Sequence, residues 1–445
     1  MLGSGLHNKS TSKNIISNKF SALFDGTDDY VDASTVASDI SLTTGTISLW
    51  ANVTSLDHSF PNFWNCSDGT STDDKIFIHY NKSTGKIRAI YKSGGGSEIA
   101  ATHDISNSDL INAGWFHIVM TYDTTADEIK LYYNGSASAT GNVQDSQTIT
   151  PIDSSSVTLD TVHLGKPTNT TSNNLLTGRI DEYAYFARVL TAAEVSDIYA
   201  AKARFNYKDS LSLKGSANQL KQWLRFGDGI VSGLPDTNST VDDRIILDMA
   251  NPTVGSELVI DGTFDVGDTN ADGSHANLST SSLRFDNWVE QNSSGERTFT
   301  KITNGTRCTI VTSTDNTWHT RLYQTINPVL DVGGFYYFSV TALASIDCIF
   351  RLAIQQTNST TNQFLGEGSN VAMTANEKKR NQGFFLCDNN TSQVIHLFPN
   401  FSSSTPTSDG TDGEFYEVSN VSLKKLQGNT AFASGANIKQ ENVPS

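Results

Sequence analysis

Apolar and polar residues alternate along most of this chain, so that every second side chain is hydrophobic over short segments. Residues 46–53 show the pattern most clearly, because Ile47, Leu49, Ala51 and Val53 fall on one face of an extended strand. A period of two is typical of a strand with one buried face, and it predicts a strand here. The longer period of amphipathic helices is missing over most of the chain.

Further segments with strand patterning follow in both halves of the chain. In the first half they are residues 76–80, 86–91, 115–122, 128–133, 157–164 and 178–186. In the second half they are residues 297–302, 308–312, 320–324, 335–343, 348–355, 382–387, 393–398 and 414–423. Short polar turns separate neighbouring strands, as at residues 83–85 and 134–135, which favours antiparallel hairpins.

Two segments indicate helices. Thr191 and Glu194 have the spacing of a capping box, in which a hydroxyl and a carboxylate satisfy the first free N–H groups of a helix. Residues 204–254 mix apolar with basic and polar side chains, and we expect a helix around residues 218–224.

These patterns predict an all-β protein with two antiparallel β-sandwich (jelly-roll) domains joined by a partly helical connector. A chain of 445 residues exceeds what one hydrophobic core usually organises, which also favours more than one domain. The expected parts are an N-terminal arm (residues 1–17), a first sandwich (18–205), the connector (206–254), a second sandwich (255–426) and a polar C-terminal tail (427–445).

Charge and composition exclude several function classes. The net charge of −16 argues against a nucleic-acid partner, because phosphates are neutralised by clusters of Lys and Arg. No stretch is apolar enough to span a bilayer, and the first 19 residues lack the apolar core of a secretory signal. We therefore expect synthesis in a cytoplasm without membrane insertion. Buried, reduced thiols are expected at the four widely spaced cysteines, Cys66, Cys308, Cys348 and Cys387.

The first sandwich resembles the laminin G-like, or concanavalin A-like, superfamily in its pentraxin-like branch. The segments that carry this resemblance are residues 24–31 (FDGTDDYV), 46–51 (TISLWA), 115–122 (WFHIVMTY), 130–135 (KLYYNG) and 176–183 (LTGRIDEY). They occur in the order that the superfamily shows, over most of the domain. The resemblance implies a β-sandwich with a short helix after its last strand.

The second sandwich resembles a jelly-roll carbohydrate-binding module. Residues 257–264 (ELVIDGTF), Asn287 and Trp288 match its opening, and residues 415–423 (FYEVSNVSL) match its final strand. The connector, at residues 220–229 (LKQWLRFGDG), is similar to a segment that recurs in structural proteins of marine bacteriophages. That last resemblance implies a virion setting, with the protein made in the host cytoplasm.

Two groups of acidic residues are candidate metal ligands, because hard cations prefer carboxylate and carbonyl oxygens. The superfamily often binds Ca²⁺ near its first strand, which implies Asp25 and Asp28 in a turn, with Asp181 from the late strand. Asp268, Asn270 and Asp272 have the spacing of the first half of an EF-hand loop, although Ser279 stands where that loop ends in Glu. The alternatives are an Asx turn for the first group and a polar loop for the second.

Aromatic and amide side chains in polar segments are candidate glycan ligands, because sugars stack on aromatic rings and hydrogen-bond to amides. In the first sandwich these candidates are His58, Phe60, Asn62, Phe63 and Trp64, with Asn65 beside them. In the second sandwich they are Trp288, Trp318, Arg321 and Tyr323. The alternative for each is a place in the core or in a subunit interface.

Aromatic residues occupy both faces of the predicted strand at residues 335–338. A strand covered on both sides has this pattern, and the cover is a neighbouring subunit, the other domain or a loop of the same chain.

The sequence does not predict catalysis. Glycoside hydrolases place two carboxylates across a sugar ring, and neither Asp127, Glu128 nor Glu182 has a partner at a suitable spacing. We therefore expect a non-catalytic virion structural protein, as a tail fibre, head fibre or capsid decoration, that mediates glycan adhesion to the host. Other virion proteins and further copies of the chain are the expected partners. The alternatives are a purely architectural capsid protein that binds no sugar, a bacterial surface lectin, and an enzyme.

Overall fold

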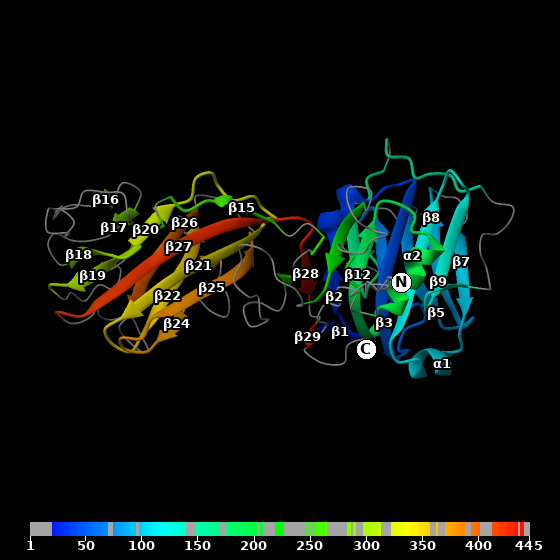
Figure 1. Cartoon of the computed structure of the whole chain (residues 1–445), viewed down its shortest axis with the longest axis horizontal. Helices are drawn as coiled ribbons and strands as arrows, with labels where there is room; N and C mark the ends of the chain where they lie inside the picture. The colour runs from blue at the N-terminus through cyan, green and yellow to red at the C-terminus, as the bar shows by residue number, and fades with distance from the viewer. Residues whose placement is uncertain are drawn as a thin grey trace, which may run out of the picture. The chain divides into compact units, whose positions relative to one another are not determined.

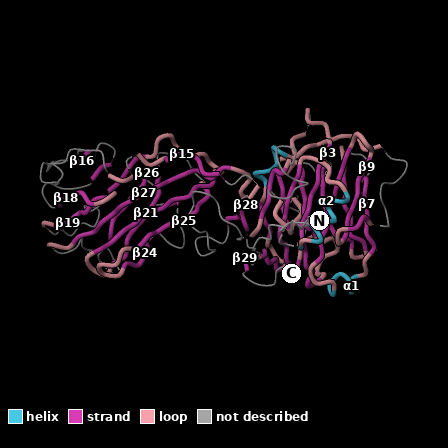
Figure 2. The backbone as a smooth tube through the Cα atoms, in the orientation of Figure 1, coloured by secondary structure: helices cyan, strands magenta, loops and turns pink. Residues whose placement is uncertain are grey.

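The computed structural model of this chain divides into two units. The described residues are 20–69, 74–94, 98–138, 148–155, 157–168, 174–202, 205–207, 219–226, 245–246, 249–250, 253–260, 262–264, 283–285, 288–290, 297–312, 322–356, 362–363, 370–387, 393–400, 412–434 and 437–439. The first unit contains the described residues up to Ala250 together with residues 428–439, and the second lies between residues 253 and 427. Strands dominate both units, as Figure 2 shows, and every strand pair is antiparallel.

Two eight-stranded sheets form the first unit. Sheet A has the order β10 (Ser136–Ala137), β9 (Glu128–Tyr133), β8 (Phe116–Asp123), β3 (Thr44–Ser55), β12 (Thr177–Phe186), β1 (Ser21–Asp25) and β29 (Asn437–Lys439), with β13 (Leu220–Leu224) also paired to β12. Sheet B has the order β14 (Ile245–Ile246), β28 (Ala431–Ser434), β2 (Tyr30–Asp32), β11 (Thr161–Leu164), β4 (Asn62–Ser67), β5 (Lys75–Asn81), β6 (Lys86–Lys92) and β7 (Ile99–Asp104).

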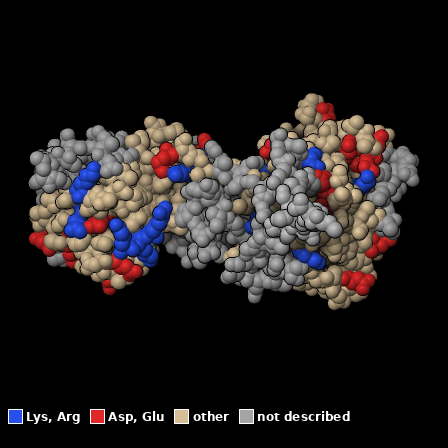
Figure 3. All heavy atoms as spheres, in the orientation of Figure 1, with Lys and Arg blue, Asp and Glu red and all other residues tan. Residues whose placement is uncertain are grey.

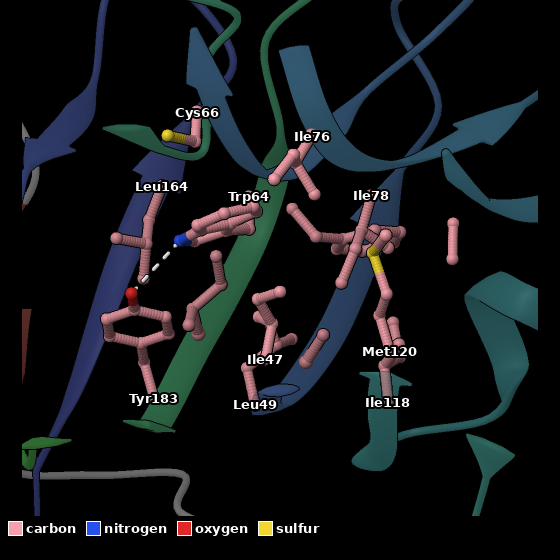
Figure 4. Packing of buried hydrophobic residues seen from close by; sticks show 14 of the residues in the cluster. Ile47, Leu49, Trp64, Cys66, Ile76, Ile78, Ile118, Met120, Leu164 and Tyr183 are labelled. Carbon is pink, nitrogen blue, oxygen red and sulfur yellow. Dashed lines mark hydrogen bonds between the residues drawn. The ribbon is translucent and has the colours of Figure 1, made fainter. Parts of the chain in front are cut away.

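The core of the first unit lies between these two sheets. Ile47, Leu49, Ala51 and Val53 all enter it, as the alternation in residues 46–53 predicts. From sheet B, Trp64 crosses the core and donates a hydrogen bond of 3.1 Å to the hydroxyl of a tyrosine on sheet A, drawn as the dashed line in Figure 4. The indole N–H therefore has a partner in an otherwise apolar interior, where an unpaired donor would cost about 1–3 kcal/mol.

A helix covers the outer face of sheet A. Helix α2 (Ala192–Ala200) begins at the predicted capping box, in which Thr191 and Glu194 exchange hydrogen bonds. Its residues Val195 and Ile198 pack with Trp223 of β13 in a second, smaller apolar cluster. The other helices of the described chain are short, namely the 3-10 helix η1 (Ser34–Asp39) and α1 (Asn107–Asn112).

A fully buried histidine lies beneath this helix. His117 of β8 has no exposed surface, stacks on Trp50 at 5.0 Å, and shares a hydrogen bond of 2.9 Å with the hydroxyl of Ser48. Burial lowers the pKa of its imidazole to about 3, because a charged ring would lose its water here.

A buried ion pair joins β13 to β12. Glu182 accepts hydrogen bonds from Arg225 Nε at 2.8 Å and from Trp223 Nε1 at 2.6 Å. The two charged side chains are 2% and 5% exposed. The predicted helix at residues 218–224 is therefore wrong. This part of the connector forms strand β13, because its apolar residues Leu220, Trp223 and Leu224 are buried when it pairs with sheet A.

The expected polar C-terminal tail is also wrong for residues 431–439. Strand β28 pairs with β2 and β14, and β29 pairs with β1, so the end of the described chain completes both sheets of the first unit. Figure 1 shows these red strands beside the blue N-terminal ones. The second unit is thus an insertion between two segments of the first.

Two further sheets form the second unit. Sheet C has the order β18 (Arg297–Ile302), β19 (Gly305–Ile310), β27 (Phe415–Gln427), β21 (Phe335–Ala344) and β25 (Lys379–Leu386), with β15 (Thr253–Glu257) also paired to β27. Sheet D has the order β16 (Leu283–Phe285), β17 (Trp288–Glu290), β20 (Leu322–Thr325), β26 (Gln393–Asn400), β22 (Cys348–Gln356) and β23 (Asn362–Gln363), with β24 (Asn370–Met373) also paired to β22. One core cluster, with residues such as Phe338 and Leu397, joins them. The four cysteines are buried and free, as predicted.

The cover over β21 comes from the same chain, at least in part. Tyr336 and Phe338 enter the core, whereas Tyr337 faces the other side of sheet C and is still only 3% exposed. Its hydroxyl donates a hydrogen bond of 3.0 Å to Gln382. A neighbouring subunit is therefore not needed to bury this ring.

Removal of residues 428–445 should destabilise the first unit and spare the second. The deletion removes β28 and β29 and leaves β1 and β2 with unpaired backbone groups, at about 1 kcal/mol for each lost hydrogen bond. We expect the unfolding free energy of the first unit to fall by roughly 3 kcal/mol or more, measured as two separate transitions in denaturant. A chain that ends at residue 439 is the matched control. Equal stability of the two truncations would contradict the pairing described here.

Candidate functional site

The outer face of sheet B carries a row of polar and aromatic side chains. On β5, Ile76, Ile78 and Tyr80 point into the core, so the alternating positions Phe77 and His79 face outward. Asn62 of β4 and Arg88 of β6 lie directly opposite His79 in the two neighbouring ladders, and Asn65 lies opposite Phe77. We call Asn62, Asn65, Phe77, His79 and Arg88 the sheet B surface, although all of them except Arg88 are buried by the loops and side chains above the sheet.

His79 is held between two aromatic rings. Phe60, in the loop before β4, stacks on its imidazole at 5.5 Å, and Phe77 meets it edge-on at 5.1 Å. The residue is 8% exposed, and its Nε2 atom has no hydrogen-bond partner in the described part of the chain. Burial, with smaller contributions from Arg88 and Lys75, lowers the pKa of His79 to about 3, so the ring is neutral at pH 7.

A chain of hydrogen bonds fixes the amides of β4. Thr168 donates from Oγ1 to Asn65 Oδ1 at 2.9 Å, and Asn65 donates from Nδ2 to Asn62 Oδ1 at 3.2 Å. Asn62 in turn donates to the carbonyl oxygen of Phe60 at 2.8 Å. These buried amides therefore position the Phe60 loop, and their own polar atoms are already engaged within the protein.

Three carboxylates gather in the turn between β1 and β2. Single oxygens of Asp25, Asp28 and Asp29 lie within 4.8 Å of one another, and the first two residues are exposed. The turn is braced by its own backbone, since Asp25 N–H donates to Asp29 at 2.8 Å and Thr27 N–H to Asp25 at 2.7 Å. Burial raises the pKa of Asp29, and the negative charges of the other two carboxylates add to that effect.

The predicted glycan candidate His58 lies beside this turn. His58 Nε2 lies 2.8 Å from the carbonyl oxygen of Gly26, which itself sits at a φ of +79°, where glycine is favoured. Asp57 accepts a hydrogen bond of 2.8 Å from Thr177 at the start of β12. The acidic turn and the loop that carries His58 and Phe60 therefore share one end of the sandwich.

The structure separates Asp181 from the other two predicted ligands of the first metal site. Asp25 pairs with Thr177, four residues earlier on β12, which places Asp181 about 13 Å along the strand. Its side chain has no exposed surface. The prediction that Asp181 joins Asp25 and Asp28 is therefore wrong, because the register of β12 carries it past the turn.

Phe63 and Trp64 are also placed differently from our prediction of a ligand-binding loop. Both belong to β4, and both have no exposed surface. The register shifts between Asn62 and Trp64, so two consecutive residues face the core while Asn62 and Asn65 face outward. A sugar cannot reach either ring. Of the aromatic candidates in this segment, only Phe60 remains half-buried at the surface.

The candidates in the second unit divide in the same way. Trp288 has no exposed surface and stacks on Phe264 at 5.0 Å in the core, so its predicted ligand contact is wrong. Tyr323 of β20 is half-buried; its neighbours Leu322 and Gln324 are buried on the core side, so Tyr323 faces the outer side of sheet D. Trp318, Arg321, Asp268, Asn270 and Asp272 lie outside the described residues.

Sequence reasoning missed His79, Phe77 and Arg88. The signal was present, because the apolar alternation of Ile76, Ile78 and Tyr80 assigns the intervening residues to the opposite face. What the sequence did not show is that the neighbouring strands would place Asn62 and Arg88 on either side of His79.

The late-strand carboxylates are not available for hydrolytic chemistry. Asp181 and Glu182 are 0% and 1% exposed, and Glu182 is paired with Arg225.

On the face drawn in Figure 3, acidic and basic side chains of the described residues are interspersed. No helix in the described ranges has the length and apolar character that a membrane span requires.

Family models match both units. Residues 25–196 match the model of the concanavalin A-like lectin/glucanases superfamily, and residues 256–398 match that of a carbohydrate binding domain. The first unit is thus a laminin G-like sandwich and the second a jelly roll of the carbohydrate-binding-module type. These matches confirm the predicted all-β fold of two sandwich domains and describe lectin-like rather than catalytic domains.

Several solved structures resemble parts of the chain. The CBM40 domain of the Ruminococcus gnavus IT-sialidase, bound to α2,3-sialyllactose, is 17% identical, with 41% of this chain and 94% of that chain covered and a TM-score of 0.30. Domain 4 of the Geobacillus stearothermophilus arabinanase AbnA is 17% identical over 40% and 75% of the two chains, with a TM-score of 0.29. A pentraxin from Limulus polyphemus is 15% identical over 40% and 81%, with a TM-score of 0.28. No curated protein matches the chain.

Acid should destabilise the first unit through its buried histidines. His79 and His117 each have a folded pKa of about 3, below the 6.5 of an unfolded histidine, so the unfolded state binds more protons between these values. The stability that depends on the two neutral rings is fully present above pH 6.5. The free energy of unfolding then falls by about 1.4 kcal/mol per pH unit for each ring as the pH drops towards 3. Urea unfolding from pH 7 to pH 4 measures this slope. The H117Q variant should have a shallower slope by one proton, and an unchanged slope would contradict the assignment.

Proposed function

We propose that this chain is a non-catalytic, glycan-binding structural component of a bacteriophage particle, as a tail fibre, head fibre or capsid decoration. The observation that carries the proposal is the match of residues 256–398 to a carbohydrate binding domain, joined in one chain to a lectin-type sandwich. The phage setting rests on the resemblance of residues 220–229 to a segment of marine phage proteins. The protein would then be made in the host cytoplasm and assembled into the virion.

The outer faces of the two units supply the chemistry that a weak glycan contact needs. Phe60 and Tyr323 present partly exposed rings on which the apolar face of a sugar can stack. Copies of the chain on one particle, held by other virion proteins, would combine such contacts into useful avidity at the host surface.

One observation favours the architectural alternative. Trp64 and Trp288 are two of the aromatic residues that a sugar site would use, and both are buried in the cores of the two units. These two rings are then unavailable to a sugar, as they would be in a capsid-stabilising protein that binds none. Electron microscopy of the particle with this chain labelled separates the two functions: a fibre tip supports adhesion, and a repeating lattice position with no glycan binding supports decoration.

Loss of the Tyr323 ring should weaken glycan binding by the second unit. The Y323A variant removes a stacking surface on the outer side of sheet D, and we expect roughly a tenfold loss of affinity, about 1.4 kcal/mol. Glycan-array screening followed by calorimetry on the full chain provides the measurement. Y337F, on the other sheet of the same unit, is the matched control. Binding by Y323A that equals the wild type would remove this surface from the proposal.

We further propose that the acidic turn formed by Asp25, Asp28 and Asp29 binds Ca²⁺. Three carboxylates within 4.8 Å suit a hard cation, and their mutual repulsion would be relieved by it. We expect Ca²⁺ to raise the Tm of the wild-type chain and to raise it less in D28N. The control is D153N, which alters an exposed Asx-turn carboxylate elsewhere in the unit. A Ca²⁺ shift that is the same in all three proteins, or absent from the wild type, would rule out this site.

A further inference from the structure

An imidazole, a guanidinium and an aromatic ring converge on the sheet B surface. His79 and Arg88 are directly opposite in the β5–β6 ladder, where facing side chains start about 5 Å apart. The Phe60 ring lies over the imidazole at 5.5 Å. The group thus places a half-buried apolar ring and a partly exposed positive charge on either side of a buried, neutral imidazole.

The polar atoms of this group are under-used within the protein. His79 Nε2 has no partner among the described residues, although leaving a buried polar atom unpaired is unfavourable. The Arg88 guanidinium has five N–H donors, and within the described ranges it makes one hydrogen bond, from Nη2 to Glu98 at 3.3 Å. The two side chains are 24% and 34% exposed. By contrast, the amides of Asn62 and Asn65 are already bonded and serve as supports.

We propose that this group binds a sugar residue that carries a carboxylate, such as a hexuronic or nonulosonic acid. The inference rests on the proposed glycan-binding function and assigns a ligand class to the first unit. The carboxylate takes the free donors of Arg88 in the two-point geometry that guanidinium favours, and displaces Glu98 from its single contact. The sugar ring stacks on the partly exposed Phe60 ring, which the buried imidazole of His79 supports from below.

The chemistry favours an acidic sugar over the other ligands of a lectin fold. A neutral sugar would leave the guanidinium charge paired only with Glu98, whereas a carboxylate repeats the interaction that Glu98 already makes. A bare phosphate would use Arg88 but leave the Phe60 ring without a stacking partner. His79 is neutral at pH 7, so it adds no second charge beside Arg88.

Paired ligands and charge-matched variants of the full chain test the proposal. The probes are a hexuronate tetrasaccharide with its carboxyl-reduced form, and a sialylated trisaccharide with its asialo form, titrated calorimetrically. We expect the wild type to bind at least one acidic probe tenfold or more tightly than its neutral counterpart. R88Q should lose that preference, and K86Q, the same charge change two residues along β6, should keep it.

Glu98 provides a test with the opposite sign. If its carboxylate competes for Arg88, then E98Q should bind the acidic probe several-fold more tightly than the wild type, which a purely structural role would not produce. Equal binding of acidic and neutral probes, or of R88Q and K86Q, overturns the inference. Tyr323-dependent binding of neutral glycans alone would leave the proposed function standing and this inference refuted. A wild type that binds no saccharide refutes both.

Discussion

The bulge at Glu182 is the constraint on which the first unit depends. Its backbone lies at a φ of +46°, and the register of β12 against β3 shifts between Asp181 and Ala184. A residue with a side chain costs about 1–2 kcal/mol in this region. The cost is offset because Glu182 turns to the outer face, where Arg225 and Trp223 both bond to its carboxylate. At this point β12 exchanges its neighbour β1 for β13. Loss of Arg225 would leave the Glu182 carboxylate as an uncompensated charge in the interior.

The bulge also determines how the candidate surface is supported. Ile180 and Tyr183 both point inward, because the two residues between them face outward together. Tyr183 thereby reaches Trp64 across the core. Trp64 lies between Asn62 and Asn65 on β4. Its hydrogen bond across the core holds this strand in place, and the two asparagine amides lie on the outer face of sheet B. The outer face of sheet B and the ion pair outside sheet A are thus connected through the hydrogen bond between Trp64 and Tyr183.

The sequence predicted local structure well and long-range pairing poorly. Strands such as Glu128–Tyr133 and Arg297–Ile302 have the predicted bounds, because alternation and turns are local signals. The segment of Phe63 and Trp64 was misassigned, since a bulge places two consecutive aromatic residues on one face and breaks the alternation. Strands β13, β28 and β29 carry weak patterns of their own, and their place is decided by edges that β12, β1 and β2 leave open. His79 became a candidate only when its neighbours across the sheet were known.

The insertion of the second unit changes how this protein would respond to proteolysis. The polypeptide enters that unit near residue 253 and leaves it near residue 427, and both flanking segments belong to the first unit. A protease that cuts the chain once, on either side of the insertion, leaves the two units covalently joined through the other crossing. Shedding of the second unit requires two cleavages. The protein would therefore keep both units after a single cleavage, which two domains joined by one linker would not.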